Sequence, residues 1–123
     1  DWESAEPDGM PLWDLFYFLR SYVVSAARAA GDHSRLAGFA AHFIDHGTLS
    51  DALVEIVHRY REQVGLSGGM IELLFYTCWL HRALKQATLL PPERVDRDGH
   101  YANLLRLCLG RREGPTFRRI SGA

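Results

Sequence analysis

The sequence has few of the features that mark a secreted or nucleic-acid-binding protein. Only two cysteines, Cys78 and Cys108, occur in its 123 residues. Both fall within apolar helical patterns, which is typical of buried thiols in a reducing compartment, although a disulfide between them is the alternative. The net charge of -1 provides no overall basic field that would attract nucleic acid. We therefore expect a cytoplasmic protein with no nucleic-acid partner.

Long uncharged apolar runs are missing as well. The longest apolar stretch, residues 12–30, is interrupted by Asp14, Arg20 and Arg28, and these charges make it a poor membrane span. No basic segment followed by an apolar run begins the chain. Because the sequence does not begin with Met, it is either a processed chain or a piece of a longer one. The motif-like residues at its start favour the interpretation as a piece of a longer chain. We expect no membrane partner.

The remaining composition describes one ordinary globular domain. The chain is 47% hydrophobic and 24% charged, and its length allows one core but not two comfortable ones. No stretch alternates apolar and polar residues over enough positions to predict a strand. The sequence therefore predicts an all-α fold.

Apolar residues at steps of three and four predict about five helices. These cover roughly residues 12–30, 34–46, 49–64, 70–88 and 99–109. The first and fourth are apolar on most sides, which indicates central helices. We divide the chain into a loop of residues 1–11, a helical subdomain of residues 12–110, and a basic tail of residues 111–123 that we expect to be frayed.

The N-terminal residues form the most distinctive pattern. Asp1-Trp2-Glu3 precedes a loop broken by Gly and Pro, which runs into Pro11-Leu12-Trp13-Asp14-Leu15. This pattern resembles the aminoglycoside phosphotransferase family of small-molecule kinases, which includes choline and homoserine kinase relatives. The motif covers about the first twenty residues, and the rest matches only as a helical C-terminal subdomain of a protein-kinase-like fold. The resemblance implies transfer of the γ-phosphoryl group of ATP to a hydroxyl of a small-molecule alcohol.

The resemblance also implies roles for individual residues. Asp1 would bind Mg²⁺, a hard cation that prefers carboxylate oxygen and is held between the phosphates of ATP. Glu3 would be a second carboxylate near the metal or the substrate. Asp14 would anchor the catalytic loop by accepting hydrogen bonds from its backbone, since a carboxylate set among apolar residues needs such donors. The helices that follow would line the substrate pocket, with Glu72 and Trp79 as contacts.

The catalytic parts of such a kinase are missing from these residues. In the family, a His-Gly-Asp-type loop with a downstream asparagine precedes the Asp-Trp-Glu motif and would therefore lie before residue 1. No Gly-rich phosphate loop followed by a lysine occurs either. We expect the chain to be inactive alone and to need the missing N-terminal part of the same kinase as its partner.

The histidines suggest a metal site as a rival interpretation. His42 and His46 are spaced i, i+4 with Asp45 beside them, and Glu55 and His58 have the Glu-x-x-His spacing of di-iron bundles. However, a di-iron bundle needs a second such motif and two further Glu residues. A zinc site at His42 and His46 is the other possibility, but it lacks a convincing third ligand. Scattered histidines are more often surface residues or hydrogen-bonded core residues.

The other alternative is a helical interaction module without chemistry. Such a module would carry an exposed apolar patch, with Trp13 or Phe16 as its members. A kinase fragment would instead expose apolar surface around residues 1–18, where the missing parts pack. A self-sufficient module would bury that face.

Overall fold

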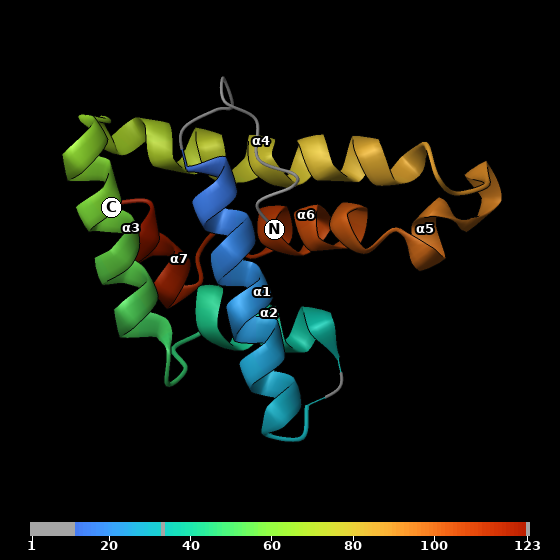
Figure 1. Ribbon diagram of the computed structural model, residues 1–123, viewed down its shortest axis with the longest axis horizontal. Helices are drawn as coiled ribbons and strands as arrows, with labels where there is room; N and C mark the ends of the chain where they lie inside the picture. The colour runs from blue at the N-terminus through green and yellow to red at the C-terminus, as the bar shows by residue number, and fades with distance from the viewer. Residues whose placement is uncertain (1–11, 33, 123) are drawn as a thin grey trace.

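A computed structural model describes residues 12–32 and 34–122 (Figure 1). Every regular element in these ranges is helical, which confirms the all-α prediction. The elements are α1 (Trp13–Ala29), α2 (Arg35–Phe43), α3 (Ser50–Val64), α4 (Gly68–Ala87), the 3-10 turn η2 (Pro92–Arg94), α5 (Val95–Asp98), α6 (His100–Gly110) and α7 (Pro115–Ile120). None of the helices in these ranges has the length and apolar character needed to cross a membrane.

The predicted helix count of five was too low. The five predicted helices correspond to α1, α2, α3, α4 and α6, and the structure adds the short helices α5 and α7. We expected the C-terminal tail to be frayed, but it forms α7, which buries Thr116, Phe117 and Ile120. The backbone N–H of Thr116 also donates to the carbonyl of Ile44 at 2.9 Å, so the tail is fixed to the end of α2.

α4 and α6 form one side of the molecule. They lie side by side along its longest axis, and α1 packs on α4 and crosses the pair in the view of Figure 1. α2 packs on α1, and the C-terminal α7 returns to pack on α3. The predicted central helices α1 and α4 both contribute buried side chains to the core.

The core is aromatic and is centred on Phe75 of α4. Its ring lies 5.1 Å from Phe16, 5.7 Å from Trp79 and 4.8 Å from Phe117, measured between ring centroids. Several of these pairs are edge-to-face or tilted, which suits the charge distribution of the rings. Since these residues come from α1, α4 and α7, one ring cluster connects the first and last helices of the described chain.

The start of α1 has an unusual backbone. Leu12, which precedes the helix, has φ of 72° and is the one non-glycine residue of the described chain with positive φ. Such a conformation costs about 1–2 kcal/mol for a residue with a Cβ. The Leu12 side chain is only 1% exposed, and burying a leucine contributes about 1.5–3 kcal/mol. Burial of its side chain therefore offsets the strain.

Candidate functional site

The structure describes only some of the residues to which the kinase resemblance assigns a role. Asp1 and Glu3, the predicted metal-side carboxylates, lie outside the described residues. Asp14 lies in the first turn of α1, where a negative charge complements the helix dipole. We expected it to sit among apolar residues, but its side chain is exposed. It forms no hydrogen bond or ion pair with residues 12–32 or 34–122, and its role as an anchor stays a prediction.

Trp13 fixes the start of α1 on α4. Its indole N–H donates to Thr77 Oγ1 at 3.2 Å, and its ring stacks on His81 with centroids 4.8 Å apart. The Cys78 thiol also approaches the backbone carbonyl of Trp13 at 3.6 Å. These contacts hold the first turn of α1, with Asp14 in it, in a defined position against α4.

An apolar groove runs along α4 beside this first turn. Its volume is about 350 Å³, and it is lined by Trp13, Met70, Leu73, Leu74, Thr77, Leu80, His81 and Leu84. Leu73 is 54% exposed, Leu80 46% and Leu84 61%. Phe16, which we considered for an exposed patch, is fully buried instead. Within the groove, the exposed apolar surface therefore comes mainly from α4.

The two predicted substrate contacts have different surroundings. Glu72 lies on α4 and pairs with Arg112, whose guanidinium is 3.1 Å from its carboxylate. Trp79 is fully buried, between Phe39, Phe75 and the ring of Tyr101. Neither residue lines the apolar groove. Their contact with a substrate stays a prediction.

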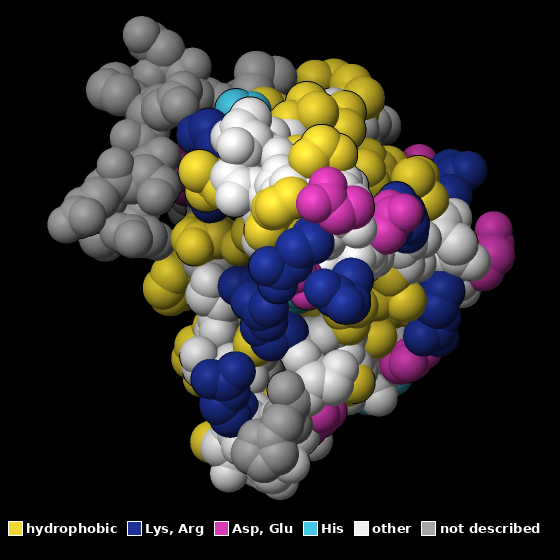
Figure 2. Space-filling view, turned by 90° about the vertical axis from the view of Figure 1, so that its right-hand side faces the viewer, with side chains coloured by type: hydrophobic (Ala, Val, Ile, Leu, Met, Phe, Trp, Pro, Cys, Tyr) yellow, Lys and Arg dark blue, Asp and Glu magenta, His cyan; other side chains and the backbone are white. Residues whose placement is uncertain are grey.

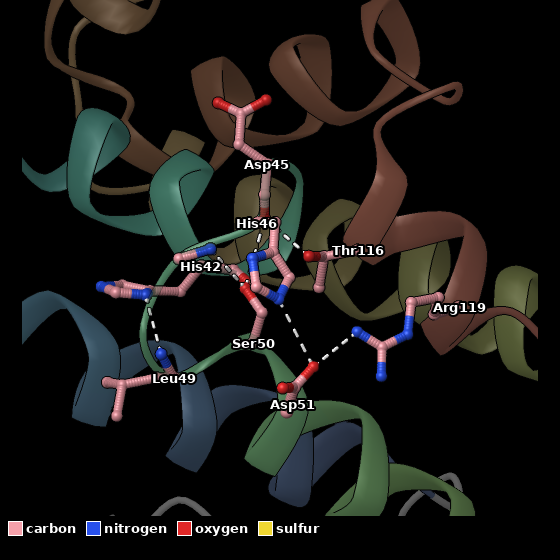
Figure 3. Close-up of polar contacts among 9 residues, drawn as sticks. His42, Asp45, His46, Leu49, Ser50, Asp51, Thr116 and Arg119 are labelled. Carbon is pink, nitrogen blue, oxygen red and sulfur yellow. Dashed lines mark hydrogen bonds and ion pairs between the residues drawn. The ribbon is translucent and has the colours of Figure 1, made fainter.

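The predicted helix over residues 34–46 ends earlier than expected: α2 ends at Phe43, so His42 lies in its last turn and His46 lies in the turn that follows. His42 Nδ1 accepts a hydrogen bond from the backbone N–H of Leu49 at 3.3 Å, whereas His46 Nε2 lies 3.4 Å from Asp51 (Figure 3). Their side chains thus have different partners. No group of three or more His, Cys, Asp or Glu side chains in residues 12–32 and 34–122 is arranged to hold a metal ion.

These histidines belong to a polar network that joins α2, α3 and α7. Ser50 is fully buried, and its hydroxyl donates to the carbonyl of His42 at 2.7 Å while accepting from the N–H of Gly47 at 2.8 Å. Asp51 accepts from Arg119 at 2.7 Å (Figure 3). These hydrogen bonds lower the pKa of the Asp51 carboxyl, with Arg119 as the main cause. The network is a structural one, because its buried polar atoms satisfy the backbone of the α2–α3 turn.

Sequence reasoning missed a buried pair formed by Arg20 and His100. Arg20 Nη2 lies 2.7 Å from His100 Nε2, and the two residues are 7% and 6% exposed. Burial, and next the nearby Arg20 cation, lower the pKa of His100 to about 4. One signal was present in the sequence, since Arg20 interrupts a helix predicted to be central.

In comparisons with known proteins, no protein-family model, no curated protein and no solved structure matches the chain.

Proposed function

We propose that this chain is the C-terminal helical part of a phosphotransferase that moves the γ-phosphoryl group of ATP to a hydroxyl of a small molecule. The observation that carries the proposal is the motif pair Asp1-Trp2-Glu3 and Pro11-Leu12-Trp13-Asp14-Leu15. In this account Asp1 binds Mg²⁺ between the phosphates of ATP, and the metal neutralises the charge that develops there. The catalytic base and the ATP-binding lobe come from the part that precedes residue 1.

The surroundings of Asp14 support the proposal. Its carboxylate is exposed at the N-terminal end of α1 and has no partner within the described chain. Trp13 is held to Thr77 and His81, so the neighbouring carboxylate has a fixed backbone. An anchor for a separate loop needs both properties, because it must be rigidly placed and still able to accept hydrogen bonds.

The apolar groove on α4 fits the proposal and fits a helical interaction module equally well. Exposed apolar patches mark surfaces that another segment or protein covers. In the kinase account, the preceding part of the same protein covers Leu73, Leu80 and Leu84. A helical interaction module would use the same groove for a partner, so the groove alone does not separate the two functions.

An enzyme assay of the intact protein distinguishes a phosphotransferase from an interaction module. We expect consumption of ATP that depends on Mg²⁺ and on a hydroxyl-bearing small molecule, measured over a panel of amino alcohols, sugars and aminoglycosides. The double variant Leu80→Lys and Leu84→Lys should lower this activity, because it places charges where the preceding part packs. Leu109→Lys, at a position that is 52% exposed on α6, is the matched control. Absence of ATP consumption with every member of the panel would contradict the proposal and favour the interaction module.

A further inference from the structure

A polar hollow lies between the N-terminal ends of α2 and α6. Its volume is about 400 Å³. Ser34, Arg35 and Leu36 line it from the start of α2, and Arg97, Asp98, His100 and Asn103 line it from α5 and α6. We call this feature the α2–α6 hollow. Figure 2 views this side of the molecule and shows Arg and Lys side chains gathered at the centre of the face.

We propose that the α2–α6 hollow binds a phosphate group. The inference does not depend on the kinase proposal, because it rests on residues of α1, α2, α5 and α6 alone. Three features carry it: two helix N-termini that open on one hollow, an excess of positive charge around it, and a buried arginine behind it that lacks a counter-ion.

The first feature is a set of backbone donors. α2 has 9 residues and α6 has 11, and each begins at the hollow. The N–H groups in the first turn of a helix have no acceptor within the helix, and their dipoles favour an anion. At α2 the Ser34 hydroxyl satisfies only the N–H of Ala37, at 3.2 Å. At α6 the side chain of Gln86 satisfies only the N–H of Tyr101, at 3.0 Å. Arg35, Leu36 and His100 therefore offer first-turn N–H groups to a ligand.

The second feature is the local charge. Asp98 is the one carboxylate that lines the hollow, and it is already paired, with Arg94 Nε at 2.6 Å and Arg97 Nε at 3.5 Å. Arg35 forms no ion pair within residues 12–32 and 34–122. Asp32, which is close in sequence, accepts the N–H of Ser34 at 3.0 Å and does not line the hollow. The lining therefore keeps a net positive charge.

The third feature lies directly behind His100. Arg20 is 7% exposed, its Nε is buried without a hydrogen-bond partner, and no carboxylate of the described chain pairs with it. Burial is the main cause that lowers its pKa. Tyr101, whose ring centroid is 5.3 Å from the guanidinium carbon, raises the pKa, and the neighbouring cation Arg35 lowers it. A buried charge without a counter-ion is costly. A bound anion in the hollow would compensate for the charges of Arg20 and Arg35 together.

His100 connects this arginine to the hollow. Because a guanidinium only donates, His100 Nε2 is the acceptor in the 2.7 Å contact, and the proton of the neutral ring lies on Nδ1. Nδ1 forms no hydrogen bond with a described residue, and His100 lines the hollow. It is thus a further donor, polarised by Arg20 through the ring.

The donor set fits phosphate better than carboxylate. Guanidinium groups of Arg35 and Arg97, N–H groups of two helices and an imidazole N–H approach from separate elements. A phosphate dianion has three or more oxygens that accept from different directions, and it forms strong bonds with arginine. A carboxylate has only two oxygens and a single charge, so it would leave donors and positive charge unmatched.

Calorimetric titration of the full chain tests the proposal. The probes are inorganic phosphate and methyl phosphate at constant ionic strength, with acetate as the comparison. We expect saturable one-to-one binding of phosphate and much weaker binding of acetate. Tighter binding of methyl phosphate than of inorganic phosphate would identify the group as a phosphomonoester of a small molecule, and the reverse order would identify free phosphate. Both results support a phosphate site.

Variants locate the binding in the hollow. Arg35→Gln and Arg97→Gln should each weaken phosphate binding by about tenfold, the loss expected for one charge-assisted hydrogen bond. Arg28→Gln removes an exposed arginine of α1 that does not line the hollow and should leave binding unchanged. Undetectable binding, equal losses in all three variants, acetate binding as tight as phosphate, or tighter binding of a single-stranded oligonucleotide than of either probe would overturn the proposal. Since all three arginines are exposed, we expect each variant to fold.

Discussion

At the scale of single residues, Ser50 shows how a buried hydroxyl can hold a turn together. We predict that Ser50→Ala lowers the free energy of unfolding by about 2 kcal/mol, because it leaves the N–H of Gly47 and the carbonyl of His42 without their partner. Urea denaturation measures the change. Ser25→Ala, at an exposed position of α1, should change stability by less than about 0.5 kcal/mol. Equal stability of the two variants would show that the hydroxyl is not needed.

His100 makes stability depend on pH in one direction. Its pKa in the folded protein is about 4, lowered from 6.5 mainly by burial. Between these pH values the unfolded chain binds a proton at His100 that the folded protein does not bind, so the free energy of unfolding falls as the pH decreases. The full loss is about 3 kcal/mol, reached near pH 4.

The variant His100→Gln isolates this effect. Its amide keeps an acceptor for Arg20 but does not titrate, so the difference in unfolding free energy between wild type and variant should shift in favour of the variant from pH 7 to pH 4. Denaturation of both proteins at several pH values measures this difference. Contributions from groups that titrate in both proteins, such as His42 and Asp51, cancel in it. A difference that stays constant with pH would contradict the assigned burial of His100.

At the scale of helices, Gly38 controls how closely α1 and α2 approach. A Cβ on Gly38 would lie 2.8 Å from the Cβ of Ala27, whereas a Cβ on Gly69 would meet nothing within 4 Å. Both glycines lie within helices. We predict that Gly38→Ala destabilises the protein by about 1–3 kcal/mol through overpacking. Gly69→Ala should stabilise it by up to about 1 kcal/mol through helix propensity. Thermal denaturation compares them, and a stable Gly38→Ala protein would contradict the close packing.

The same scale shows why some helices were predicted and others were not. The five predicted helices have several turns of apolar residues at helical spacing, so local pattern and tertiary packing agree. α7 has only six residues, and its place depends on burial of Phe117 and on the hydrogen bond from Thr116 to Ile44. Such contacts join residues far apart in the chain and leave no local period.

The polar sites were difficult to predict for the same reason. His42 and His46 have a spacing typical of metal ligands, but their side chains bind different partners, Leu49 and Asp51. Arg20 and His100 are 80 residues apart, and only the packing of α6 near α1 joins them. Residue spacing within one helix is readable from sequence, whereas pairing between helices is not. The motif at residues 1–15 needed no tertiary information, which is why it supplied the functional hypothesis.

At the scale of the whole molecule, the described helices form a scaffold with two distinct surfaces. The apolar groove of α4 lies beside the first turn of α1 and suits a covering segment. The α2–α6 hollow is polar and cationic and suits a small anion. In the proposed kinase, α1 carries Asp14 in its first turn, and the aromatic core around Phe75 holds that end of the helix in place.

We propose that Asp1 is the Mg²⁺ ligand, and a kinetic comparison of variants of the intact protein tests this role. In the intact protein we compare Mg²⁺-dependent phosphoryl transfer from ATP by wild type, by Asp1→Ala and by the control Glu55→Ala, which alters an exposed carboxylate of α3 paired with Arg59. Loss of the metal ligand should abolish transfer while circular dichroism and melting temperature stay unchanged, and the control should keep full activity. Wild-type turnover by Asp1→Ala would contradict the assignment.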